Sequence, residues 1–255
     1  KDQDVTSTPG SISYMLQKDL LLPHKKVIDN VALPLVLKGV KKAEAREKAN
    51  PLFAEFGLEG TQYQYPSQLS GGMRQRVCIA IGLACNPRLI IADEPTTALR
   101  PLPFRRRSWH LMRNLKDKIN SSIMLITHDL GVIAEMADYV VVMYAGRVVE
   151  KGTASEIFKN PSHPYTIGLM RSKPVVGKKV DKLYSIPGKV PNPIDMPDYC
   201  YFRDRCELSC DKCQGSYPGV IKLSPTHEVS CYRYADRPEA GWLANVHPGE
   251  GGKNS

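Results

Sequence analysis

The sequence predicts an α/β fold built around buried parallel strands. Leu89–Ala92 is too uniformly apolar for a half-exposed strand and suits a parallel strand buried on both faces, which ends in Asp93 and Glu94. A second such strand is predicted over Ser122–Thr127 and ends at His128. Because ligands of open α/β sheets bind at the carboxyl ends of the strands, we expect these polar side chains to line a ligand site.

Small residues open the helix that precedes the first of these strands. Ser70, Gly71 and Gly72 leave no bulk at the start of a helix predicted through Leu83, so its backbone N–H groups and positive dipole end can approach an anion. This arrangement suits a phosphate group. By itself Ser-Gly-Gly is equally a turn, and Asp-Glu is equally an exposed strand end. The two halves together, some twenty residues apart, form the more specific pattern.

The two halves resemble the signature and Walker B motifs of ABC-type ATPases, with Met73 where the commonest form has glutamine. The chemistry of the strand end agrees, because Asp93 can hold Mg²⁺ through its water shell and Glu94 can polarise an attacking water as general base. The resemblance implies an incomplete ABC-type (RecA-like) P-loop core. It also implies that ATP bound to a second ATPase subunit is contacted by the signature residues Ser70, Gly71, Gly72, Met73 and Gln75.

Two further residues occupy places that the family uses for catalysis. His128 follows Glu94 by about 35 residues, where the family has a switch histidine that bonds the γ-phosphate. An isolated histidine at a strand end is otherwise an ordinary surface or core residue. Gln17 ends a strand predicted over Ile12–Leu16, in the place of the Q-loop glutamine, which reaches the metal and the attacking water.

The chain divides into predicted segments with different compositions. Helices are predicted over Ile28–Leu37 and Lys41–Phe56, the second ended by Gly57, and a hairpin joins strands Tyr139–Met143 and Arg147–Glu150. The predicted segments are the end of an N-terminal core with the Q-loop (1–18), a helical subdomain with the signature motif (19–85), a catalytic α/β core (86–152), a C-terminal helical segment (153–185), a Pro-rich linker with a cysteine cluster (186–235) and a flexible tail (236–255).

Residues 100–109 interrupt the family pattern. The family follows Walker B with a loop ending in Leu-Asp and then a helix, whereas this stretch contains two prolines and three successive arginines. A compensated frameshift in the coding sequence explains Pro103–Trp109, and a functional basic patch is the alternative.

Five of the seven cysteines lie between Cys200 and Cys231. Cys200, Cys206, Cys213 and Cys231 are separated by five, six and seventeen residues, and four thiolates suit either a 4Fe–4S cluster or a tetrahedral Zn²⁺ site. Cys210 and Cys213 form a two-residue gap that also suits zinc. Reasoning from the residues leaves the two metals open.

The C-terminal part resembles the extension of oligopeptide, dipeptide and nickel ABC importer ATPases, over about residues 66–235. The resemblance rests on His163–Thr166, Asn192-Pro193 and the cysteine spacing, and it implies a 4Fe–4S cluster on the four cysteines. Tyr14–Pro23 and Asp29–Ala32 look more like ATPases of nitrate, sulfonate and taurine importers. A chimera joined near Ser70–Arg76 is therefore one hypothesis.

The Walker A loop, Gly-x-x-x-x-Gly-Lys-Ser/Thr, is expected about forty residues before Gln17, and the sequence does not contain it. We therefore expect a fragment that is inactive alone. No stretch approaches the ~20 apolar residues that span a bilayer, and the first residues are not a signal peptide. The net charge of +9 permits a nucleic acid or an anionic membrane as partner, but a generally basic surface explains it equally.

The sequence thus predicts an ATP-hydrolysing subunit of an importer for peptides or a related solute, with ATP, Mg²⁺ and a 4Fe–4S cluster as cofactors. The expected partners are a second ATPase subunit, membrane permease subunits and, indirectly, a solute-binding protein, at the cytoplasmic face of the membrane. No nucleic acid is expected. The alternatives are a nucleotide-incompetent remnant and a DNA-repair-type ABC ATPase, against which the lack of sustained heptads counts.

Overall fold

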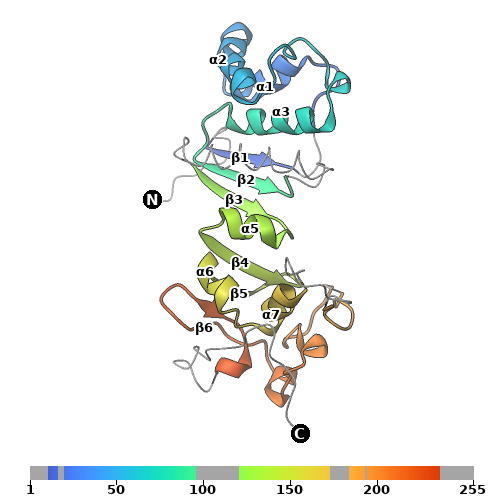
Figure 1. The fold of residues 1–255 in the computed structure, drawn as a ribbon, viewed down its shortest axis with the longest axis vertical. Helices are drawn as coiled ribbons and strands as arrows, with labels where there is room; N and C mark the ends of the chain where they lie inside the picture. The colour runs from blue at the N-terminus through green and yellow to red at the C-terminus, as the bar shows by residue number, and fades with distance from the viewer. Residues whose placement is uncertain (1–10, 17–19, 96–120, 173–183, 193, 236–255) are drawn as a thin grey trace, which may run out of the picture. The chain divides into compact units, whose positions relative to one another are not determined.

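A computed structural model describes residues 11–16, 20–95, 121–172, 184–192 and 194–235. The chain forms two compact units, Lys1–Leu130 and Gly131–Ser255, which are described separately (Figure 1). Among the described helices, none has both the length and the apolar character needed to cross a membrane.

A three-stranded parallel sheet forms the base of the first unit. Its order is β1 (Ile12–Met15), β2 (Leu89–Asp93) and β3 (Ser122–Ile126), with Leu89 opposite both Ile12 and Ser122. The α/β prediction and all three predicted strands are confirmed. Ile90 and Ala92 are buried, as expected for a strand with a partner on both sides.

The predicted burial of the strand over Ser122–Thr127 is wrong. Met124 and Ile126 of β3 are 53% and 41% exposed. Helix α3 (Gly71–Leu83) packs against β1, whereas no described helix packs comparably against β3. An apolar sequence therefore predicted the strand correctly but could not say which strand the helix covers.

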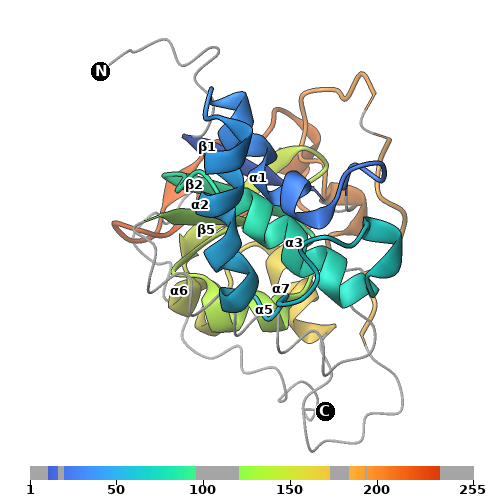
Figure 2. The ribbon, with the colours of Figure 1, turned by 90° about the horizontal axis from the view of Figure 1, so that it is seen from above.

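The first unit also contains helices, in the region predicted as a helical subdomain (Figures 1 and 2). Helices α1 (Val27–Leu37) and α2 (Lys42–Glu55) pack together, and α1 also packs on α3. A 3₁₀ turn over Pro66–Gln68 precedes α3 in the chain. Their shared apolar side is the core of the unit, which includes Val27, Val31, Ala45, Ala49, Phe53, Phe56, Leu58 and Val77.

Polar contacts lock α1 to its neighbours. Arg46 donates two hydrogen bonds to the Asp29 carboxylate, at 2.9 and 2.8 Å, and these bonds hold the pKa of Asp29 below its usual value. Asn30 is only 2% exposed. Its side chain accepts a hydrogen bond from the Leu22 backbone N–H and donates hydrogen bonds to three backbone carbonyls. The loop before α1 is thereby fixed to the helix.

Gly57 ends α2 as predicted, with φ of +57°. The carbonyls of Phe56 and Gly57 each accept a 2.8 Å hydrogen bond from Nη1 of Arg76 on α3. A Cβ atom at position 57 would lie 3.0 Å from that nitrogen. Arg76, in the middle of α3, therefore supplies hydrogen-bond donors to the free carbonyl groups at the end of α2.

The second unit begins with α5 (Leu130–Met136) and contains an antiparallel sheet of order β4-β5-β7-β6. Its strands are β4 (Tyr139–Tyr144), β5 (Arg147–Thr153), β6 (Ile221–Lys222) and β7 (Glu228–Val229). The predicted hairpin is confirmed, and Ala145 and Gly146 form its turn with φ of +46° and +80°. Two positive φ values are what the twist of a two-residue hairpin requires.

Two helices follow the hairpin, α6 (Ala154–Lys159) and α7 (Pro164–Arg171). His163 is the N-cap of α7, and its Nδ1 accepts a hydrogen bond from the Tyr165 N–H at 3.1 Å. Burial lowers the pKa of His163 to about 4, although Glu150 opposes this shift, so the ring stays neutral and can accept. The His-Pro-Tyr-Thr stretch thus has a helix-capping role.

Glu150 of β5 is the buried centre of this unit. Its carboxylate accepts hydrogen bonds from the N–H groups of Ser162 (2.7 Å) and His163 (2.9 Å), and it pairs with Nε2 of His227 at 2.8 Å. The side chains of Glu150 and His227 are 0% and 6% exposed. The carboxylate therefore ties β5 to the start of α7 and to the segment that leads into β7. A core of Tyr144, Val149, Tyr201 and Phe202 lies in the same unit.

Candidate functional site

The parallel sheet of the first unit brings the predicted catalytic side chains to one edge. Asp93 is the last residue of β2 and lies opposite Ile126 at the end of β3. Glu94 and His128 follow these two strands. Because parallel strands point the same way, all three side chains gather at the carboxyl edge, where α/β sheets bind ligands.

Glu94 and His128 are in direct contact. Glu94 Oε1 lies 2.5 Å from His128 Nδ1 and accepts the His128 backbone N–H at 3.0 Å. The Glu94 side chain is 17% exposed and that of His128 is 75% exposed. A shielded carboxylate beside an exposed imidazole has the geometry of a general base with an orienting partner.

The backbone at Glu94 is held in an unusual conformation. Its φ is +47°, in the left-handed region that residues with a side chain rarely adopt. The Glu94 N–H donates to the Ile126 carbonyl at 2.9 Å, so β3 holds the strained residue in place. Such strain is concentrated at functional sites, where the surrounding structure offsets its cost of about 1–3 kcal/mol.

Two parts of the predicted site lie outside the described residues. Gln17 is one of them. The other is the segment after Walker B, including residues 100–109, on which the frameshift hypothesis depends. Both hypotheses therefore stay predictions.

The start of α3 has the predicted open geometry. Ser70 is the N-cap, and its Oγ accepts the Met73 N–H at 3.3 Å. Gly71 is exposed, and a Cβ atom there would meet only the end of the Arg74 side chain, at 3.9 Å. The first N–H groups of a helix have no partner within the helix, so an anion can approach them here.

Further residues of the signature stretch face the protein. Arg74 donates from Nη1 to the Leu69 carbonyl at 2.8 Å and so fixes the entry to the helix. Met73 is half-buried. Gln75 Oε1 is buried and has no hydrogen-bond partner in the part of the chain that the structure describes. The open face of the helix start is therefore formed by Ser70 and Gly71.

The helix start and the strand ends are separated along α3. The contact of α3 with β1 is at Gly82, where a Cβ atom would lie 3.3 Å from side-chain atoms of Met15 and Ser13. With a rise of 1.5 Å per residue, Gly71 lies about 17 Å from Gly82 along the helix. The small-residue half of the motif thus begins well away from the point where the same helix meets the sheet.

The cysteines of the second unit lie near one another. Cys200 and Cys206 interact electrostatically with Cys213 and with Cys231, and Cys210 Sγ lies 3.5 Å from Cys213 Sγ. Burial raises the pKa of all four predicted ligand thiols, that of Cys231 to about 12. Within the described ranges, no group of three or more His, Cys, Asp or Glu side chains has the arrangement of a metal site.

Comparisons with known proteins match two separate parts of this chain to protein families. The model "ABC transporter" matches residues 1–97, which include the signature and Walker B stretches. The model "Oligopeptide/dipeptide transporter, C-terminal region" matches residues 149–213, which include Glu150, α7 and three of the four predicted ligand cysteines. The ABC-type resemblance predicted from the sequence is thereby confirmed.

Curated relatives point the same way. The chain is 48% identical over 202 residues to the oligopeptide transport ATP-binding protein AppD of Bacillus subtilis, covering 78% of this chain and 61% of AppD. It is 41% identical over 226 residues to a putative peptide import ATP-binding protein of Brucella melitensis, covering 85% and 67%. The dipeptide transport ATP-binding protein DppD of Lactococcus lactis is 45% identical over 225 residues, covering 86% and 64%.

A solved structure supports the fold. It is an ATP-binding cassette determined as a dimer in a post-hydrolysis state bound to ADP and Pi, and it is 29% identical with a TM-score of 0.52, covering 60% of this chain and 68% of that one. The chain spans 61% to 67% of the length of the three curated relatives. From these similarities, the chain belongs to the family of ATP-binding proteins of oligopeptide and dipeptide ABC transporters.

Proposed function

We propose that the protein hydrolyses ATP to drive the import of peptides. The observation that carries this proposal is the Glu94–His128 contact, 2.5 Å long, beside Asp93 at the carboxyl edge of a parallel sheet. It combines a shielded carboxylate with a partner that can bond the terminal phosphate. ATP is proposed as the substrate because residues 1–97 match the ABC transporter family.

Each residue has a chemical role in the proposal. Asp93 would hold Mg²⁺, which when bound would supply positive charge against the phosphates. Glu94 accepts the proton of the attacking water as general base. His128 holds the Glu94 carboxylate and bonds the γ-phosphate, so the presence of that phosphate is linked to the position of β3. Gln17, which lies outside the described residues, would contact the metal and the attacking water.

The open start of α3 serves a second subunit in this proposal. Ser70, Gly71 and Gly72 present helix N–H groups to the γ-phosphate of ATP bound by a partner ATPase, with Met73 and Gln75 behind them. Two subunits thus enclose the nucleotide, and hydrolysis opens the pair. The opening resets permease subunits in the membrane, and the ATPase lies peripherally at its cytoplasmic face. A solute-binding protein supplies the permease with its cargo.

The relatives favour import over the other functions considered. The Brucella relative, a putative peptide import protein, is similar over 226 residues, which is 85% of this chain. One family therefore accounts for most of the sequence, including residues 149–213, which match the oligopeptide/dipeptide transporter model. The proposed cargo is a peptide, as in the names of these relatives.

Substitution at the helix start tests the proposed function. In the complete transporter, reconstituted in vesicles with ATP inside, Ser70→Arg is expected to reduce uptake of a labelled dipeptide at least tenfold. The long side chain removes the cap and fills the space in front of the helix N–H groups. Ser67→Arg is the matched control, because Ser67 is an exposed serine of the preceding 3₁₀ turn. Equal uptake by the two variants would count against the proposal.

We also propose that Cys200, Cys206, Cys213 and Cys231 hold a 4Fe–4S cluster. The chemistry of the donor set supports this proposal, because four soft sulfur atoms interact electrostatically with one another, although the described side chains are not in the arrangement of a metal site. When bound, the cluster supplies a rigid cross-link among these loops. Buried thiols with raised pKa values stay protonated at neutral pH unless a cation replaces their protons. Zn²⁺ is the alternative occupant.

Visible absorption after anaerobic purification tests the cluster. Cys206→Ser is expected to lose most of the iron and the brown absorption of the wild-type protein, since one ligand of four is removed. Cys210→Ser is the matched control and is expected to keep both, because Cys210 is exposed and is not one of the four. Stoichiometric zinc without iron would instead identify a zinc site, and metal-free wild-type protein would exclude both.

A further inference from the structure

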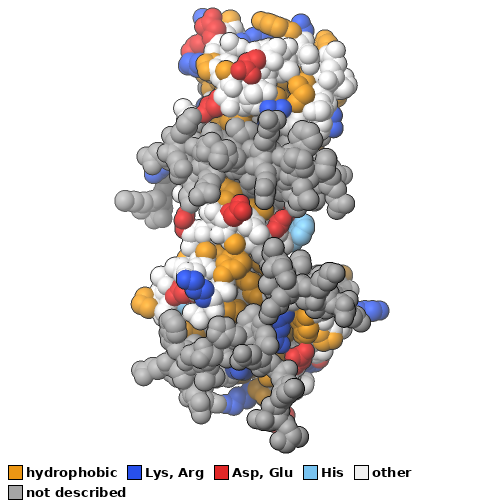
Figure 3. Space-filling view, in the orientation of Figure 1, with side chains coloured by type: hydrophobic (Ala, Val, Ile, Leu, Met, Phe, Trp, Pro, Cys, Tyr) orange, Lys and Arg blue, Asp and Glu red, His pale blue; other side chains and the backbone are white. Residues whose placement is uncertain are grey.

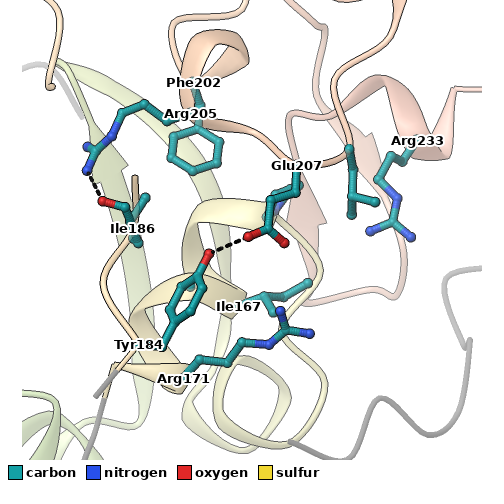
Figure 4. Close-up of a pocket in the computed structure, with 11 residues that line it drawn as sticks. Ile167, Arg171, Tyr184, Ile186, Phe202, Arg205, Glu207 and Arg233 are labelled. Atoms are coloured by element: carbon teal, nitrogen blue, oxygen red, sulfur yellow. Dashed lines mark hydrogen bonds between the residues drawn. The ribbon is translucent and has the colours of Figure 1, made fainter. Parts of the chain in front are cut away.

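A cavity of about 270 Å³ lies within the second unit, next to the predicted ligand Cys206 but lined by none of the four predicted ligand cysteines. Figure 4 shows its walls, which come from α7, the segment at Tyr184–Ile186 and the loop that carries Phe202 to Glu207. Its apolar surface is formed by Pro164, Ile167, Ile186, Phe202 and Leu208. The cavity therefore has an apolar interior that a hydrocarbon side chain could fill.

Gly168 shapes this interior. A Cβ atom at Gly168 would lie 2.9 Å from both Cγ1 and Cδ1 of Ile186. Only a residue without a side chain lets Ile186 pack this closely against α7. The glycine thus brings an apolar wall against the helix whose last residue is Arg171.

Charged groups line the same cavity. In Figure 4, the guanidinium groups of Arg171 and Arg233 lie on the same side as the Glu207 carboxylate. Over the described ranges of the chain, neither guanidinium group makes a hydrogen bond or an ion pair, although that of Arg233 lies near enough to Cys206 and Cys231 to interact with them electrostatically. Glu207 accepts one hydrogen bond at Oε1, from the Tyr184 hydroxyl at 3.0 Å, which leaves its carboxylate with further acceptor capacity.

Arg205 is different from these two arginines. It donates from Nε to the Pro187 carbonyl at 2.7 Å, from Nη2 to the Ile186 carbonyl at 3.1 Å and from Nη1 to the Tyr144 hydroxyl at 3.4 Å. These hydrogen bonds fix the Ile186–Pro187 segment, which forms one wall of the cavity. Arg171, Arg233 and Glu207 are therefore the charged residues of the cavity that can bind a ligand.

We infer that this cavity binds a small zwitterion with an apolar side chain, that is, a free amino acid or a dipeptide. Arg171 and Arg233 hold its carboxylate, since guanidinium groups pair with carboxylates through charge-assisted hydrogen bonds. Glu207 holds its ammonium group. The apolar side chain lies against Ile167 and Phe202. The site goes beyond the proposed ATPase function, because it shares no residue with the nucleotide-binding set and needs no ATP.

Size and charge select this class of ligand. The volume lies just below the range of about 300–1,000 Å³ that accommodates drug-sized molecules, so the ligand must be small. A simple anion such as inorganic phosphate would satisfy the arginines but would be repelled by Glu207 and would leave the apolar wall uncovered. A zwitterion with a hydrocarbon side chain can pair its carboxylate with the arginines, pair its ammonium group with Glu207 and cover the apolar wall.

Calorimetric titration of the full 255-residue chain with leucyl-leucine, without nucleotide, tests the inference. We expect saturable binding that Arg171→Met and Arg233→Met each weaken about tenfold, the loss expected for one charge-assisted contact. Arg88→Met is the matched control, because Arg88 is an exposed arginine of the first unit, and its affinity is expected to equal that of the wild type. Thermal melts of all variants show whether each one is folded.

Glu207→Gln separates the zwitterion from a plain acid. It is expected to weaken leucyl-leucine about tenfold while leaving N-acetyl-leucyl-leucine, which has no ammonium group, unchanged or tighter. Equal affinity for a peptide capped at both ends, tighter binding of inorganic phosphate, or no binding of leucyl-leucine at millimolar concentration would each overturn the inference. None of these outcomes bears on ATP hydrolysis, which is measured separately through Glu94.

Discussion

Glu94→Gln is expected to reduce ATP turnover by the complete transporter by a factor of about 10²–10⁴, the usual contribution of a general base. The amide cannot accept the proton of the attacking water. Its oxygen can still accept the His128 N–H that Glu94 Oε1 accepts at 3.0 Å, so the edge of the sheet is expected to keep its structure. Phosphate release measures turnover, and binding of a fluorescent ATP analogue, expected to be unchanged, measures the nucleotide affinity.

Two further variants sharpen this experiment. Glu59→Gln is the matched control, because Glu59 is an exposed glutamate of the same unit, and full turnover is expected. His128→Ala in the Glu94→Gln background is expected to cost little more than Glu94→Gln alone, since residues that act as a unit have non-additive effects. Turnover of Glu94→Gln at the wild-type rate would refute the assignment of the general base.

Glu150→Ala is expected to destabilise the second unit by about 3–5 kcal/mol, because it removes a buried carboxylate that accepts two backbone hydrogen bonds and contacts the His227 ring. The change leaves the N–H groups of Ser162 and His163 and the His227 ring without their acceptor, in a place where water does not reach. Urea unfolding followed by near-ultraviolet circular dichroism measures the loss, because the core of this unit contains Tyr144, Tyr201 and Phe202.

Glu228→Ala is the matched control for Glu150→Ala. Glu228 lies on β7 and pairs at 2.8 Å with Lys151, which directly follows Glu150 on β5, and the two side chains are partly exposed. Pairs of this kind contribute up to about 1 kcal/mol. A loss for Glu150→Ala no greater than that for Glu228→Ala would show that the buried carboxylate does not hold the unit together.

The sequence was sufficient for features that depend on neighbouring residues. Apolar runs and helical spacing predicted β1, β2, α1, α2 and α3, and Gly57 predicted the end of α2. The same holds for Asp93 and Glu94, because a strand that ends in two carboxylates delivers both to the edge of a sheet. The motif pair was specific enough to indicate the ABC family, which the relatives confirm.

The sequence was insufficient where distant segments meet. The exposure of Met124 and Ile126 depends on which strand α3 covers, and an apolar pattern does not contain that information. Glu150 and His227 are 77 residues apart, so nothing near Glu150 indicates that it will be buried and paired. The cavity between α7, Glu207 and Arg233 likewise has no local signal, because its charged residues look like ordinary surface residues in the sequence.

The sequence by itself determined the family, the parallel strands and the identity of the residues at their ends. Only the tertiary structure decided that Glu94 and His128 touch, that Glu94 takes a positive φ, and that Arg171, Glu207 and Arg233 line one cavity. The physical reason is the range of the interactions. Strand and helix formation follow from residues a few positions apart, whereas burial, ion pairing and cavity shape depend on the packing of segments that the chain brings together only when it folds.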